Sequence, residues 1–479
     1  MCNLLQNPSF EVGLSGWVTN NVSLESRLAF EGTQAALMDT GIASIYQDVL
    51  LPETGKKPLL LSFSALSLYD SNLERPERGS LVVEVVWQNG SGSPIGIGLR
   101  LLIPSTMLVD NDTRLTYVEV TDRPPANAVS ARLQFSKGVL VNAGNPTTIG
   151  DNPIVIDQVI LAPLEDINLI NNSGFQERLF DWNSTNSGAR GLAQYEGTNY
   201  AVLNIGGVGT IYQDVPINSL PANSAFMLSF AARRGTVGSD ILVTVDYRNG
   251  AGSLGIGLSL LIPASVLNQT GWKTYAVATN TAAPVGATIA RVSFEGTAPD
   301  VSAFVDKVIL TMVKTPNLLL NPSFEAGLTN WTSENVNIVL GNSYEGTQNA
   351  RVGSEAFIFQ DVNIGTDARC CYLLTFGAQG SSLQSDALVE VIWLNAEGRE
   401  IGLGTSLVIP KSALSRQLPT GQQISVWATF VSVTEPSPPE ATAARVLFSV
   451  ANSSIIDIDL VSLTRMSCPI PPPIRGMVF

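Results

Sequence analysis

The strongest constraint on the fold is a threefold internal repeat. The motif at residues 3–17, which begins with Asn-Leu and ends in Trp, recurs at 168–182 and at 317–331. Three later landmarks follow in the same order in each copy: Glu-Gly-Thr at 31–33, 196–198 and 345–347; Gln-Asp-Val at 47–49, 213–215 and 360–362; and Ile-Pro at 103–104, 262–263 and 409–410. The copies start about 150 to 165 residues apart, which is the size of a whole domain and not of a solenoid repeat. The chain is therefore predicted to be a tandem triplication of one domain, and the copies are called units 1, 2 and 3.

Within each unit, apolar residues alternate with period two, which indicates β-strands. This holds at 81–87, 241–247 and 387–393, and each segment runs into a turn with Asn or Gly and then a second apolar stretch. The sequence predicts an all-β chain of three tandem antiparallel jelly-roll β-sandwich domains at 1–164, 165–314 and 315–466, followed by a Pro-rich C-terminal tail at 467–479. The short junctions at 163–167 and 313–316 do not resemble Gly/Ser linkers, so a semi-rigid rod is expected.

Composition excludes several classes of function. Acidic residues (41) outnumber basic residues (27), and the net charge of −14 leaves no phosphate-neutralising surface for a nucleic acid and no attraction to an anionic membrane. The absence of histidine removes His-based triads, His general bases and His metal ligands. No apolar run reaches the length of a membrane helix, and the first residues show no signal peptide.

The four cysteines are candidates for disulfides or cross-links, because Cys2, Cys370, Cys371 and Cys468 do not have zinc-site spacing. In a rod, Cys2 and Cys468 mark opposite ends and are not expected to pair within one chain. Three interpretations stay open. The end cysteines link successive molecules, with Cys370 or Cys371 as the partner on unit 3; or one of the vicinal pair bonds Cys468 locally and leaves Cys2 free; or all four stay reduced.

The opening motif, the Gln-Asp-Val landmark and the closing Asp-containing strand resemble the galactose-binding-like jelly rolls of carbohydrate-binding modules. The block at 95–104, with Ile-Gly-Ile-Gly-Leu and Leu-Ile-Pro, is more similar to a jelly-roll domain of Bacillus-type spore-surface proteins. The resemblance covers residues 3–164, 168–313 and 317–466.

The resemblance also implies a structural calcium ion, held by the Glu of the opening motif, carbonyls near the Glu-Gly turn and the Asp of the last strand. The matching positions are Glu11 with Asp157, Gln176 with Asp306, and Glu325 with Asp459. Gln176 lowers the charge of the site in unit 2. The alternative is that these side chains only accept hydrogen bonds from the backbone where the ends of a unit meet.

A sugar platform needs an aromatic face in a groove or loop. Trp17, Trp182 and Trp331 belong to the opening motif and are expected to be packed, whereas Trp87, Tyr247 and Trp393 share strand parity with core valines. Trp272 and Trp427 remain as weak candidates for a sugar platform. A glycosidase would need two positioned acids, but the repeated acids lie in motifs with structural explanations, so the chain is not expected to be an enzyme.

These observations predict a non-catalytic structural or assembly protein of an external surface layer, such as a bacterial spore surface. It would associate with itself through its ends and with other surface-layer proteins. The alternative is a carbohydrate-binding or adhesive module array, in which weak sites gain avidity through linkage. The tail at 467–479 has two interpretations, a frayed end or an arm that docks on a neighbour.

Overall fold

The computed structural model describes residues 2–52, 56–67, 80–104, 108, 115–138, 152–191, 194–269, 271–365, 369–382, 386–417, 423–451 and 454–468. Unit 1 contains β1 (Val18–Asn20), β2 (Val22–Glu25), β3 (Ala35–Met38), β4 (Ala43–Leu50), β5 (Leu59–Ser67), β6 (Leu81–Gln88), β7 (Pro94–Ile103), β8 (Leu115–Val120), β9 (Ser130–Lys137) and β10 (Ile154–Pro163). Unit 2 contains β11 (Asn183–Thr185), β12 (Gly188–Arg190), β13 (Tyr200–Leu203), β14 (Thr210–Pro216), β15 (Ala225–Arg234), β16 (Ile241–Asn249), β17 (Gly252–Ile262), β18 (Lys273–Ala278), β19 (Ile289–Gly296) and β20 (Ala303–Val313). Unit 3 contains β21 (Thr332–Leu340), β22 (Gln348–Asn363), β23 (Cys371–Ser382), β24 (Ala387–Leu394), β25 (Glu400–Ile409), α1 (Lys411–Leu414), β26 (Ser415–Gln417), β27 (Gln423–Ser425), β28 (Ala428–Val433), β29 (Ala443–Val450) and β30 (Ile455–Ser467).

The strands pair in the same order in each unit. Unit 1 has an outer sheet β1-β4-β9-β6-β7 and an inner sheet β2-β3-β10-β5-β8, and unit 2 repeats both as β11-β14-β19-β16-β17 and β12-β13-β20-β15-β18. In unit 3 the long strand β22 belongs to both layers and joins them into one sheet, β25-β24-β29-β22-β30-β23-β28. The predicted all-β, antiparallel sandwich class is confirmed. The domain boundaries at 164, 314 and 466 stay predictions, because strand bounds do not show that each segment folds alone.

Inner and outer sheets differ in how many of their faces are buried. Along β6 of the outer sheet, buried and half-buried residues alternate almost throughout, as period-two patterning predicts. Along β5 of the inner sheet, every residue is buried, and the same is true of β8 and β18. One face of each inner sheet lines the core of its own sandwich. The other face contributes to a shared apolar cluster that includes Leu60, Ile160, Met227, Ile309, Leu373 and Val431.

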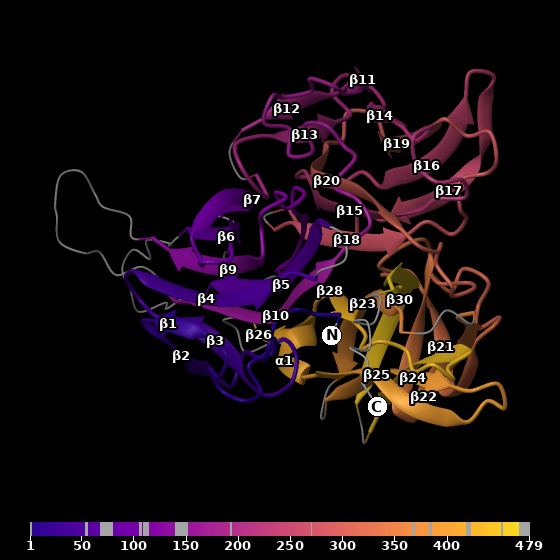
Figure 1. Cartoon of the computed structure of the whole chain (residues 1–479). Helices are drawn as coiled ribbons and strands as arrows, with labels where there is room; N and C mark the ends of the chain where they lie inside the picture. The colour runs from indigo at the N-terminus through magenta and orange to yellow at the C-terminus, as the bar shows by residue number, and fades with distance from the viewer. Residues whose placement is uncertain are drawn as a thin grey trace, which may run out of the picture.

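This shared cluster closes the units into a ring. Strands β8, β18 and β28 contact one another, and the three coloured lobes of Figure 1 lie as a triangle around them. Unit 3 returns to unit 1, since the Gly32 amide donates to the Val408 carbonyl at 2.7 Å. The predicted rod is therefore wrong. The short junctions do restrict the units, but each inner sheet has a second apolar face that a rod would leave exposed to water.

The expected packing of the repeated aromatic residues is confirmed. Trp17, Trp182 and Trp331 are buried, and each donates its indole N–H to the carbonyl of the Asn at the fifth position of the motif, residue 7, 172 or 321. Trp87, Tyr247 and Trp393 are buried in the sandwich cores. Within the described residues no helix is long and apolar enough to span a membrane. Of the tail at 467–479, residues 469–479 lie outside the described residues, so neither interpretation of it is tested.

Candidate functional site

Two of the repeated landmarks meet at every interface of the ring. The Gly of each Glu-Gly-Thr turn donates its amide to the strand just before the Ile-Pro landmark of the preceding unit. Gly197 bonds the Leu102 carbonyl at 3.4 Å, Gly346 bonds Leu261 at 2.8 Å, and Gly32 bonds Val408 at 2.7 Å. These contacts define the 1–2, 2–3 and 3–1 interfaces respectively. The landmarks that reveal the triplication are thus partly the residues that close the ring.

Around the centre of the ring, aromatic rings stack across each interface. Tyr117 stacks on Tyr195 with ring centroids 4.8 Å apart, Tyr275 on Tyr344 at 4.5 Å, and Phe430 on Phe30 at 4.5 Å. Beside these pairs the threonine hydroxyls form a cycle.

The Thr116 hydroxyl donates to the Thr429 carbonyl, Thr274 donates to Thr116, and Thr429 donates to Thr274. Every member of this cycle is buried and comes from a different unit. The centre is thus a packed axis of approximate threefold symmetry.

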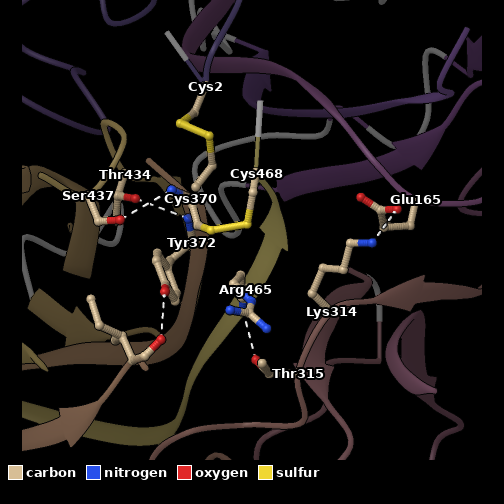
Figure 2. Close-up of a disulfide and its surroundings, with 12 residues drawn as sticks. Cys2, Glu165, Lys314, Thr315, Cys370, Tyr372, Thr434, Ser437, Arg465 and Cys468 are labelled. Carbon is tan, nitrogen blue, oxygen red and sulfur yellow. Dashed lines mark hydrogen bonds and ion pairs between the residues drawn. A yellow bond between two sulfur atoms is a disulfide. The ribbon is translucent and has the colours of Figure 1, made fainter. Parts of the chain in front are cut away.

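Two disulfides lie side by side where unit 3 meets unit 1 (Figure 2). Cys2 bonds Cys371, and Cys370 bonds Cys468. Adjacent residues entering a strand point to opposite faces, so the vicinal pair can serve two partners. The expected local bond to Cys468 is confirmed. The expectations that Cys2 stays free, or that end cysteines link successive molecules, are wrong, because the closed ring brings the two ends together and no cysteine is left free.

Trp272 and Trp427 do not form exposed sugar platforms. Trp272 is 0% exposed and contacts the edges of Tyr195 and Tyr200, and Trp427 is 4% exposed and lies on Tyr344. Trp272 stands before β18 and Trp427 before β28, the edge strands that meet neighbouring units. The expectation of exposure is wrong because aromatic residues of the same unit pack against each indole: Tyr195 and Tyr200 against Trp272, and Tyr344 against Trp427.

The positions expected to hold calcium are occupied by hydrogen-bond donors. Glu11 accepts bonds from the Thr33 amide, the Thr33 hydroxyl and the Gln34 amide. Glu325 does the same with Thr347 and Gln348, and Gln176 accepts both bonds from Thr198 without carrying a charge.

The buried aspartates behave in the same way. Asp157 accepts the amides of Phe30, Glu31 and Gln158, and Asp306 accepts the three matching amides of unit 2. Asp459 accepts the amides of Glu345 and Leu460. Burial raises the pKa values of Asp306 and Asp459 well above the usual range, and the backbone amides oppose that shift. No cluster of metal-ligating side chains is found in the described part of the chain. A neutral Gln in one copy and N–H donors at the carboxylate oxygens do not fit a cation, so calcium remains a prediction without support from this geometry.

The outer sheets carry a repeated set of surface groups that the sequence analysis missed. In each unit an aromatic ring lies under an arginine, and that arginine forms two parallel bonds with an aspartate on the paired strand. The sets, called the outer triplets, are Tyr46, Asp48 and Arg132; Tyr212, Asp214 and Arg291; and Phe359, Asp361 and Arg445. The guanidinium carbon lies 3.9–4.1 Å from the ring centroid in all three.

The outer triplets are partly exposed and electrostatically fixed. The aspartate side chains are 35–44% exposed, and the arginines are 24–32% exposed. The hydrogen bonds from Arg132 and Arg291 lower the pKa values of Asp48 and Asp214, so both carboxylates stay charged at neutral pH. The signal was present in the sequence: an aromatic residue precedes each Gln-Asp-Val, and period two directs that ring and the Asp to the same face.

Comparisons with known proteins give neighbours among solved structures alone. No family model matches the chain, and no curated protein matches it. A tandem carbohydrate-binding domain, CBM22-1-CBM22-2 of Paenibacillus barcinonensis Xyn10C, is 12% identical over 61% of this chain and 96% of its own, with a TM-score of 0.25. TmCBM61, solved with β-1,4-galactotriose, is 15% identical over 32% of this chain and 99% of its own, with a TM-score of 0.22.

A further neighbour is the enzymatically active domain of tailspike protein 4 of bacteriophage CBA120. It is 19% identical over 31% of this chain with a TM-score of 0.25, and the match spans 21% of the tailspike chain. The resemblance to spore-surface proteins stays a prediction.

Proposed function

We propose that the protein is a non-catalytic glycan-binding protein, in which a disulfide-closed ring presents three equivalent outer sheets for multivalent attachment. The observation that carries this proposal is the repetition of the outer triplet at the same register in all three units. Asp48 pairs with Arg132, Asp214 with Arg291, and Asp361 with Arg445 in each sheet ladder.

The chemistry of the triplet suits a sugar. The guanidinium covers the aromatic ring, so a sugar would stack on the guanidinium. The partly exposed aspartate and arginine edges offer acceptors and donors to neighbouring hydroxyls. Pairing with the aspartate fixes the guanidinium before a ligand arrives, which lowers the entropy cost of binding. Each site is small and weak by itself, so useful affinity would come from three sites on one rigid ring.

The ring form changes the earlier expectation of assembly. Self-association through disulfides at the ends loses its basis, because all four cysteines bond within the chain. An extracellular or spore-surface location, with partners in a surface layer, belongs to this proposal as the setting in which glycan attachment and disulfides both make sense.

The test is binding of the oxidised full chain to a glycan array, followed by titration of the strongest polysaccharide. Arg132→Met, Arg291→Met and Arg445→Met are compared singly and together. Each single change is expected to weaken binding a few-fold, and the triple change by about 100-fold or more because avidity is lost.

Arg100→Met is the matched control. Arg100 forms an exposed ion pair with Glu84 at 2.6 Å on the same outer sheet, and the corresponding positions in units 2 and 3 are Ser259 and Ser406. This variant should bind as the parent does. Unchanged glycan binding in the triple variant would contradict the proposal.

A further inference from the structure

The three interfaces share one backbone but differ at the residue after each closing aspartate. That residue is Gln158 in unit 1, Lys307 in unit 2 and Leu460 in unit 3, and it has a φ of 48°, 47° and 50° respectively. The next residue in each unit, a valine, donates its amide to the opening motif, at Pro8, Ser173 and Pro322. The side chains therefore start from equivalent places beside the preceding unit.

At the 1–2 interface this place is filled by charges. The Lys307 ammonium lies 3.0 Å from Glu119 of unit 1 and 3.6 Å from Glu196 of its own unit. Gly174 stands where units 1 and 3 have Ser9 and Ser323, and a Cβ there would lie 2.8 Å from a Glu196 oxygen. The lysine and the two carboxylates thus occupy the space between the units.

At the 3–1 interface the same place is an open cleft of about 610 Å³. Gln158 and Ser432 occupy the positions that Lys307 and Glu119 occupy at the 1–2 interface. Gln158 is only 6% exposed, and its Nε2 is buried with no hydrogen-bond partner in the described structure. A buried amide with two unused N–H groups costs free energy unless a ligand or water accepts them.

The remaining lining restricts the ligand's charge. The cleft is lined by two carboxylates, Glu31 and Glu435, and by hydroxyl groups that include Thr405 and Ser406, but by no lysine or arginine of the described residues. Anions are therefore disfavoured. Pro8, Val159 and Leu403 add apolar surface, which suits the C–H face of a ring.

We propose that the cleft of the 3–1 interface binds one neutral, polyhydroxylated ring, such as a sugar unit of a glycan. The choice of a sugar rests on the proposed function, whereas the cleft itself does not. Gln158 donates to a ligand oxygen, and Glu31, Glu435 and Ser406 are positioned for its hydroxyl groups. The site is made by two units, so it exists only while the ring is closed.

The test is titration of the oxidised full chain with methyl glycosides of glucose, galactose, mannose and N-acetylglucosamine, using glucuronate as the anionic comparison. At least one neutral glycoside should bind in the millimolar range, and glucuronate should bind about tenfold more weakly or not at all. Gln158→Leu, which places the Leu460 residue type at the matching position, should weaken binding about tenfold.

A second variant keeps the test valid if Gln158→Leu fails to fold. Ser406 is exposed on the cleft, and Ser406→Trp should fill it and abolish binding without touching a core. Ser265→Ala is the matched control, because Ser265 lines a cleft of about 420 Å³ at the 2–3 interface and its loss should change nothing.

The outcomes separate the two proposals. Absence of neutral glycoside binding up to about 50 mM would overturn the cleft, as would binding that survives both Gln158→Leu and Ser406→Trp. Binding that the outer-triplet variants remove and the cleft variants leave intact would also overturn the cleft while supporting the proposed function. Glycoside binding that only the cleft variants remove would support the cleft and would show that this binding does not need the outer triplets.

Discussion

The 1–2 and 3–1 interfaces use the same turn, the same strand and the same central stack, yet they are held together by different means. The 1–2 interface has a peptide junction at 163–167 and a buried charge group around Lys307. The 3–1 interface joins the two ends of the triplication, has no peptide junction, and carries the Cys2–Cys371 disulfide. In this ring, a disulfide stands at the interface that lacks a peptide junction, and the same interface leaves space for a cleft.

The largest expected effect comes from breaking the charge group of the 1–2 interface. Lys307→Met leaves the buried Glu119 and the half-buried Glu196 without their cation, and should cost about 3 to 5 kcal/mol of unfolding free energy. Chemical denaturation measures it. The pair Lys307→Gln with Glu119→Ser, which copies the 3–1 interface, should recover most of the loss. A loss below about 1 kcal/mol in the single variant would show that the group is not what holds this interface.

Cys2→Ser should open the 3–1 interface and spare the 1–2 interface. Loss of a link between residues 369 apart in sequence should cost about 2 to 4 kcal/mol. Hydrogen exchange should speed up at the Gly32 amide, which bonds Val408, but not at the Gly197 amide, which bonds Leu102. Cys468→Ser is the control, since its link to Cys370 stays within unit 3. Equal protection of Gly32 with and without Cys2 would refute a role for the disulfide in closure.

The 2–3 interface offers a pH test, because Glu345 is the counterpart there of Glu196 at the 1–2 interface. Burial raises the pKa of Glu345 to about 7, opposed by hydrogen bonds from the Leu261 amide and Ser323. A carboxyl whose folded pKa is raised stabilises fully below its unfolded value of about 4.5, and this stabilisation is lost as the pH rises through about 7.

Thermal and denaturant unfolding from pH 5 to pH 8 should therefore show a decline that Glu345→Gln makes shallower by about 2 to 3 kcal/mol. Glu325→Gln, at an exposed carboxylate nearby, is the comparison. Identical slopes in the parent and Glu345→Gln would rule out a raised pKa for this buried carboxyl.

The smallest effect should be a gain. Tyr195 and Tyr344 donate their hydroxyls to the Thr116 and Thr274 carbonyls, whereas Phe30 at the 3–1 interface has no hydroxyl. Phe30→Tyr places a donor beside the Thr429 carbonyl and should stabilise the ring by about 1 kcal/mol, seen as a rise in Tm. Tyr195→Phe should lower stability by a similar amount. A destabilised Phe30→Tyr would show that the central stack is less symmetric than the contacts indicate.

Much of the fold could be predicted from period-two patterning and the repeat. Apolar residues alternate along the strand at 81–87 because one of its faces is turned towards solvent, and the predicted strand is confirmed. The ring could not be predicted in the same way, although a signal existed. Strand β5, Leu-Leu-Leu-Ser-Phe-Ser-Ala-Leu-Ser, does not alternate cleanly, which is typical of strands buried on both faces. Treating each unit as a separate sandwich left the second face of β5 without a partner surface, and so predicted a rod with Cys2 and Cys468 at opposite ends.

The candidate site was less accessible from the sequence. Gln158, Lys307 and Leu460 look unrelated along the chain, since their equivalence depends on a shared positive φ after the closing aspartate. Their partners Glu119 and Ser432 come from neighbouring units. Only the ring brings these residues together. The sequence pattern of a single unit could therefore reveal neither the charge group around Lys307 nor the cleft.

The most direct test of ring closure is the radius of gyration of the oxidised monomer from small-angle X-ray scattering. Three units of about 150 residues packed as a closed ring predict a value of about 25 Å, whereas the same units end to end predict about 34 Å. A value near 25 Å is the predicted result. A value near 34 Å would contradict the account, because units 1 and 3 of an extended particle lie too far apart for Cys2 to bond Cys371.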